Sequence, residues 1–252
     1  MTILRIISIL LALGISSNSI SQQLSATDIV KRADDKMRGE KSSYSVMSMK
    51  IVRPTWERTI SFKSWGKGTE LSLVYITAPA KDKGQSFLKL NREMWSWNPS
   101  INRTIKLPTS MLSQGWMGSD FTNDDLLNQR SIVVDYTHEI VGEETVSEEL
   151  CYKILLKPKP DAPVVWGKIE MWISKKHDII LKTEYYDEDQ YLVKSEIGKN
   201  IKEMSGRYMP TTFELIPAEN EGNKTIITID EIKFDIPIEN SFFSQQNMQR
   251  IR

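Results

Sequence analysis

The sequence predicts a mainly β (α+β) protein built on one large, strongly curved antiparallel sheet. Many short runs of alternating polar and apolar residues are separated by Gly, Pro and Asn turns. No strand is flanked by the long helices that a βαβ unit needs, so a parallel sheet is not expected. One stretch, residues 110–130, is apolar at its centre and does not read as a strand. We therefore expect eleven to thirteen strands that close, or wrap around helical segments, to bury one face.

Composition excludes several classes of protein. Among 252 residues, Lys+Arg and Asp+Glu both number 33, so no long-range field favours nucleic acid or an anionic membrane surface. The chain has two histidines and one cysteine, Cys151, which argues against a His/Cys metal centre and against a disulfide framework. We expect neither a metal site nor a cofactor.

The first 21 residues have the three-part layout of a signal peptide. Arg5 supplies a positive charge, residues 6–15 are apolar, and Ser19 and Ser21 offer the small residues that a signal peptidase reads. The apolar run is shorter than the roughly 20 residues of a membrane span. We expect cleavage near Ser21, export, and a single domain over residues 22–252; an uncleaved anchor is the alternative.

The remaining elements follow in order along the chain. Residues 25–28 can cap a helix that ends near Arg38, with Ile29, Val30 and Ala33 at helical spacing. A closing helix or tail is expected at residues 241–249. The predicted strands are residues 43–51, 56–63, 71–75, 87–90, 94–97, 103–107, 132–141, 152–156, 164–173, 179–186, 191–197, 208–215 and 225–232.

Residues 110–130 are predicted to form an apolar helical plug over the sheet. Residues 122–125 resemble a capping box ahead of Leu126 and Leu127, with an acid three positions after the cap. A calcium loop using Asp120, Asn123, Asp124 and Asp125 is the alternative, although the stretch lacks the glycine and the distal glutamate of an EF-hand. The apolar side chains of the plug are Met111, Leu112, Trp116, Met117 and Phe121.

No enzyme class is indicated. The sequence contains no nucleophile elbow, P-loop, dinucleotide fingerprint or HExxH zinc motif. A catalytic triad would have to use His138 with Asp135, or His177 with Asp178, and near-adjacent residues on a strand are poorly placed for that geometry. We expect a protein without catalytic activity.

Eight short motifs follow one another along the chain. They are MRG at 37–39, RPTW at 53–56, SWGKG at 64–68, PAKDKG at 79–84, WSWNP at 95–99, RTIKLP at 103–108, WMGSDFTNDDL at 116–126 and VVWGK at 164–168. In this order they resemble the motifs of the LolA-like outer-membrane lipoprotein-sorting proteins, which are periplasmic carriers of lipoproteins or lipids. The resemblance covers nearly all of the expected mature chain and is closest to a branch found beside lipid-exporting membrane pumps.

The resemblance implies a strongly bent, incomplete antiparallel β-barrel whose open side is covered by a helical lid. Its apolar cavity would hold acyl chains of lipoproteins or lipids, received from an inner-membrane transporter or pump and passed to an outer-membrane acceptor. It also implies a periplasmic monomer with an arginine that holds the lid closed; Arg103 and Arg130 are the candidates. The alternative is an accessory module of a lipid-export pump that carries no cargo of its own.

Two glycines frame the apolar centre of the expected lid. Gly115 and Gly118 would let the lid move, whereas in a fixed plug they would only end a helix. Abundant methionine and tryptophan fit a cavity that packs against variable apolar partners, but also an ordinary core. The cavity residues are expected to be Met47, Met49, Phe62, Trp95 and Trp97 from the early strands, with Met111, Leu112, Trp116, Met117 and Phe121 from the lid.

Overall fold

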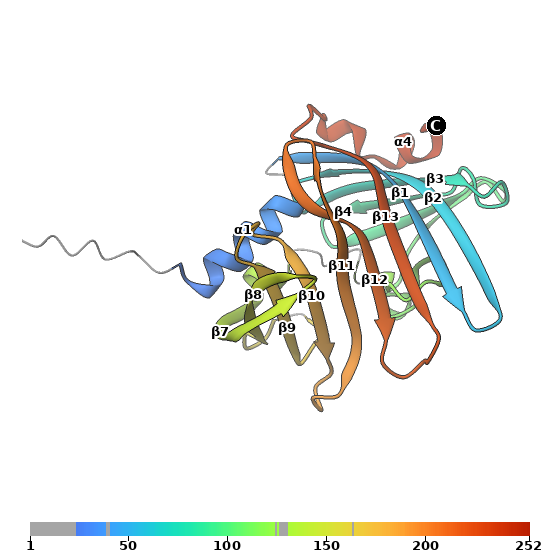
Figure 1. Ribbon diagram of the computed structural model, residues 1–252. Coiled ribbons are helices and arrows are strands. Elements are labelled where there is room, and N and C mark those ends of the chain that lie inside the picture. The colour runs from blue at the N-terminus through green and yellow to red at the C-terminus, as the bar shows by residue number, and fades with distance from the viewer. Residues whose placement is uncertain (1–23, 39–40, 124, 126–130, 163) are drawn as a thin grey trace, which may run out of the picture.

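In the computed structural model, which describes residues 24–38, 41–123, 125, 131–162 and 164–252, one antiparallel sheet organises the protein (Figure 1). Its thirteen strands lie in the order β6-β5-β4-β3-β2-β1-β13-β12-β11-β10-β9-β8-β7. The edge strands β6 and β7 do not pair with each other, so the bent sheet stays open as predicted. The strands are β1 (Ser42–Arg53), β2 (Trp56–Lys67), β3 (Leu71–Ala78), β4 (Ser86–Leu90), β5 (Glu93–Asn98), β6 (Arg103–Lys106), β7 (Tyr136–Val146), β8 (Glu149–Pro158), β9 (Lys168–Ser174), β10 (Ile180–Tyr186), β11 (Leu192–Met204), β12 (Arg207–Pro217) and β13 (Lys224–Phe234).

The helices are short and lie around this sheet. They are α1 (Ala26–Arg38), η1 (Thr109–Met111), η2 (Trp116–Gly118), α3 (Ser131–Val134), η3 (Asn240–Phe242) and α4 (Gln245–Arg250). Two predicted strands begin later than expected, because α3 occupies the start of residues 132–141 and β9 begins only at Lys168. In the described part of the chain, no helix is long and apolar enough to cross a membrane. The predicted signal peptide lies outside the described residues.

Helix α1 covers the half of the sheet formed by β7 to β10 (Figure 1). Ser25 caps it, because its hydroxyl accepts the Asp28 amide at 3.1 Å. Ile29 and Val30 of its apolar stripe are fully buried against the inner faces of β8 and β9. This packing closes one side of the concave face.

In the other half of the sheet, β1 to β6, the strands β3 to β5 are covered on both faces. The inner face carries a core that includes Met49, Ile51 and Ile60. The outer face is covered by the C-terminal segment with α4, seen at the top of Figure 1. The Ser86 hydroxyl donates to the Met248 carbonyl at 2.5 Å, which fixes α4 on β4. Apolar residues are therefore needed on both faces of these strands.

Candidate functional site

A cavity of about 460 Å³ lies on the concave side of the sheet, enclosed by both halves, α1 and the segment that follows β6. Its wall is mainly apolar, as a ligand-binding cavity usually is. The strands of the first half contribute Met47, Phe62, Val74, Phe87 and Met94. The rest of the apolar wall includes Ile169, Met171, Phe213, Ile227 and Ile229.

Residues 110–123 and Asp125, the described part of the stretch 110–130 predicted as a plug or lid, lie over one end of this concave face. Trp116 is only 3% exposed and makes edge-on contacts with Phe62 and Phe87, with ring centroids 5.5 and 5.4 Å apart. Its indole N–H makes no hydrogen bond to any described residue. Phe121 packs against the same cluster, so aromatic rings attach the lid to the sheet.

The structure brings four of the ten predicted lipid-binding residues to the cavity wall: Met47, Phe62, Trp116 and Phe121. Met49 lies beneath the lid in the closed core, and Leu112 and Met117 pack against that core without lining the cavity. Met111 is 37% exposed. Of the apolar side chains in the segment over the sheet, Trp116 and Phe121 are therefore the ones that face the cavity.

Trp95 and Trp97 do not line the cavity, which corrects their predicted orientation. In β5 they point to the outer face, where they pack with Phe243 and Met248 of the C-terminal segment. Met94, one position earlier, faces the cavity instead. Alternation orients two residues together but does not say which face is inner, and here both faces are apolar.

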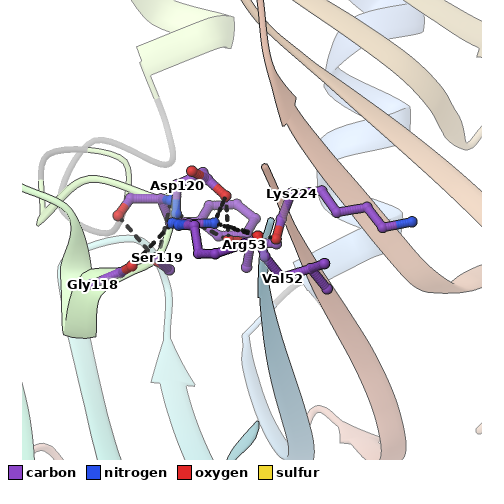
Figure 2. Close-up of polar contacts among 8 residues, drawn as sticks. Val52, Arg53, Gly118, Ser119, Asp120 and Lys224 are labelled. Atoms are coloured by element: carbon purple, nitrogen blue, oxygen red, sulfur yellow. Dashed lines mark hydrogen bonds and ion pairs between the residues drawn. The ribbon is translucent and has the colours of Figure 1, made fainter. Parts of the chain in front are cut away.

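Arg53, at the end of β1, holds the lid from the side (Figure 2). Its guanidinium donates to Asp120 Oδ2 at 3.1 Å and to the Gly118 carbonyl at 3.1 Å. The same Asp120 oxygen accepts the hydroxyl of Thr225 at 2.7 Å, and the Asp120 amide donates back to that hydroxyl at 3.0 Å. Both charged side chains are mostly buried, so this ion pair connects β1, β13 and the lid.

A second arginine, Arg58 on β2, contacts the lid beside it. It donates to Asp82 at 2.5 Å and to the Met117 carbonyl at 3.4 Å. Neither sequence candidate for the latch is supported: Arg103 is exposed on the edge strand β6, and Arg130 lies outside the described residues. Arg53 belongs to the RPTW motif, but its partner is 67 residues away, which sequence spacing does not reveal.

The predicted capping box is present at the end of the lid. The Thr122 amide donates to Asp125 Oδ2 at 2.7 Å, and the Asp125 amide donates to the Thr122 hydroxyl at 3.1 Å. Asp120 and Asp125 therefore have protein partners, and Asn123 donates its side-chain amide to carbonyls of the lid. Asp124 lies outside the described residues, and no acidic, His or Cys cluster suited to a metal occurs among the described ones.

A buried ion pair also contributes to the mainly apolar cavity wall. Lys194 of β11 has a side chain only 6% exposed and donates to Asp125 Oδ2 at 2.6 Å. Its ammonium also lies 4.8 Å from the ring of Trp166 and 5.0 Å from that of Tyr185. Glu196 shares this face of β11, and burial raises its pKa to about 7, although Lys194 acts in the opposite direction.

Glu196 should make the protein less stable as the pH rises from about 4.5 to about 7. Over this pH range the Glu196 carboxyl keeps its proton in the folded protein but has lost it in the unfolded chain. The expected loss in the free energy of unfolding is roughly 1–3 kcal/mol. Urea unfolding of wild type and Glu196→Gln at several pH values measures it, and Gln should flatten the profile. The exposed Glu203 on the same strand provides the control, Glu203→Gln; a wild-type profile for Glu196→Gln would contradict the assignment.

The two histidines of the hypothetical triads make other contacts. His138 contacts the Thr27 hydroxyl at 3.0 Å and the Ile132 carbonyl at 2.7 Å, so it joins α1 and α3 to β7. Burial lowers its pKa. His177 lies 3.3 Å from Glu149 and stacks on Tyr208. Each histidine thus contacts residues other than the acids proposed from sequence.

A family model described as "-like: Uncharacterized protein" matches residues 68–250. No curated protein matches the chain. Solved structures do match it. A DUF1329 family protein from Desulfovibrio piger is 24% identical and has a TM-score of 0.80, and the match covers 89% of this chain and 98% of that one.

Two further solved structures are similar to this chain. An outer membrane lipoprotein-sorting protein domain from Vibrio parahaemolyticus is 18% identical with a TM-score of 0.75, covering 89% of this chain and 98% of its own. A LolA superfamily protein from Nitrosomonas europaea is 23% identical with a TM-score of 0.75, covering 88% and 99%. At these identities the likeness shows the fold.

Proposed function

Since this chain belongs to the family whose model matches residues 68–250 and is LolA-like in fold, we propose that it is a non-catalytic carrier of acyl chains. Its cargo would be a lipoprotein or a lipid. The observation that supports this most is the apolar cavity of about 460 Å³ beneath a lid attached by aromatic contacts and by the Arg53–Asp120 ion pair. Burying acyl chains yields about 0.8 kcal/mol per methylene, so such a cavity needs no catalytic group to bind them.

The lid supplies the route of entry in this proposal. Arg53 and Asp120 attach it to the strands by polar contacts, which can exchange with water when the lid opens. Trp116 and Phe121 attach it by apolar contacts, which an entering acyl chain can replace. The Trp116 indole, buried without a partner, adds to the cost of the closed empty state.

The proposed setting is the periplasm. The leader pattern of residues 1–21 supports export with cleavage near Ser21, and the solved lipoprotein-sorting domain supports transfer toward the outer membrane. An inner-membrane transporter or pump would be the donor and an outer-membrane component the acceptor, with the carrier acting as a monomer.

Native mass spectrometry of protein purified from the periplasm without detergent tests this function. We expect a fraction of the protein to carry a lipid or an acylated peptide, released on denaturation and replaceable by added fatty acyl probe. Repeated isolation without acyl ligand, together with no binding of added probe, would favour the accessory module instead.

A further inference from the structure

Hydroxyl groups gather on the cavity wall away from the lid. Ser43 and Ser45 on β1, Ser64 on β2 and Ser72 on β3 all line the cavity. Ser45 lies directly opposite Ser64, whereas Ser43 and Ser72 lie on either side of Gly66. Four adjacent inner-face positions therefore carry hydroxyls in a wall that is otherwise mainly apolar.

These four hydroxyls have no hydrogen-bond partner among the described residues. Ser45 is 7% exposed and the other three serines are partly exposed, and all four line the cavity. A hydroxyl on such a wall without a protein partner can hydrogen bond to water or to a ligand group that replaces the water. Four of them at adjacent positions therefore offer a hydrogen-bonding surface to a ligand in the cavity.

Gly66 gives this wall a recess. A Cβ at this position would lie 3.3 Å from the Ser43 hydroxyl, closer than nearly all such contacts. Because Gly66 has no Cβ, the space between Ser43 and Ser72 extends to the backbone of β2. We call Ser43, Ser45, Ser64, Ser72 and Gly66 the serine notch.

The charges of the cavity favour an uncharged ligand group at the notch. Lys89 lies opposite Ser72 and lines the cavity, as does Asp34 of α1, and both already interact with other residues. Lys194, near the start of β11, forms an ion pair with Asp125. Together with Glu196, the acids that line the cavity outnumber its lysines, so the wall offers no excess positive charge for an anion.

We propose that the serine notch binds the uncharged, hydrogen-bonding head of an acylated glycerol, with its ester carbonyl and hydroxyl groups against the serines. The acyl chain then runs along Met47 and Phe62 toward Trp116, in the direction in which β1 passes from hydroxyl to apolar side chains. This inference rests on the proposed acyl-carrier function and adds the chemical class and orientation of the ligand.

The test compares a monoacylglycerol with a free fatty acid of the same chain length, as competitors for a fluorescent acyl probe. Ser45→Ala/Ser64→Ala removes one cross-strand hydroxyl pair of the notch. Ser48→Ala/Ser61→Ala is the matched control, because these serines also pair directly between β1 and β2 but do not line the cavity.

We expect wild type to bind the monoacylglycerol about tenfold more tightly than the fatty acid. The notch variant should bind the monoacylglycerol about fivefold to tenfold more weakly with little change for the fatty acid, whereas the control keeps the wild-type values. If the notch variant loses the same affinity for both ligands, or if the notch and control variants bind alike, the serine notch does not recognise the glycerol head. Either result would be compatible with the carrier function. If neither ligand competes and no probe binds, the carrier function fails as well.

Discussion

Replacing Met47 by Glu should lower the affinity for an acyl probe by at least about tenfold. Met47 lines the cavity between the serine notch and the lid, opposite Phe62 on β2. An acyl chain entering this space would have to strip water from the new carboxylate and would lose its contact with the thioether. Probe titration of the purified variant, with unfolding curves to show that it is folded, gives the measurement.

Ser48→Glu is the matched control, because Ser48 follows Met47 on the strand and points to the other face of the sheet. It adds the same charge without placing it in the cavity. Equal losses of affinity in the two variants would show that charge on β1, and not the cavity wall, determines binding.

Removing the guanidinium of Arg53 should lower the free energy of unfolding by about 3 kcal/mol, because it leaves a buried carboxylate unpaired. In Arg53→Ala, the Asp120 carboxylate would keep only its hydrogen bond from the Thr225 hydroxyl. The Gly118 carbonyl would lose the hydrogen bond that Arg53 donates to it (Figure 2). Urea unfolding measures the loss, and hydrogen exchange should show faster amides at residues 115–123 than in wild type.

Lys50–Glu57, an ion pair between β1 and β2, provides the control. This ion pair has a short distance of 2.7 Å, but its side chains are 44% and 56% exposed. Lys50→Ala should therefore cost less than about 1 kcal/mol and leave the lid amides unchanged. If Arg53→Ala costs no more than Lys50→Ala, the ion pair does not hold the lid.

The main features of the fold could be predicted because they depend on local pattern. Alternation and turn residues predicted the strands, and the glycines and apolar residues between positions 111 and 121 predicted a segment that packs over the sheet. The sequence predicts a strand from residue 132, whereas the structure has α3 over Ser131–Val134, because so short an apolar run does not distinguish helix from strand. The capping box was predictable since both of its partners lie within four residues.

The site was less predictable because its contacts are long-range. Arg53 and Asp120 meet only when β1 lies beside the lid, and Lys194 is 69 residues from Asp125. The inner and outer faces of β5 are both apolar, which hides the direction of Trp95 and Trp97. The serine notch becomes visible only from the pairing of three strands, although the serines themselves alternate along β1.

Photo-crosslinking with a diazirine-bearing fatty acyl ligand tests most directly whether acyl chains occupy the cavity. Peptide mass spectrometry should place the label on cavity residues such as Met47, Phe62 and Phe213, and an excess of unlabelled lipid should suppress it. Label that accumulates instead on exposed apolar residues such as Trp56 and Tyr191, or that unlabelled lipid does not displace, would contradict the carrier account.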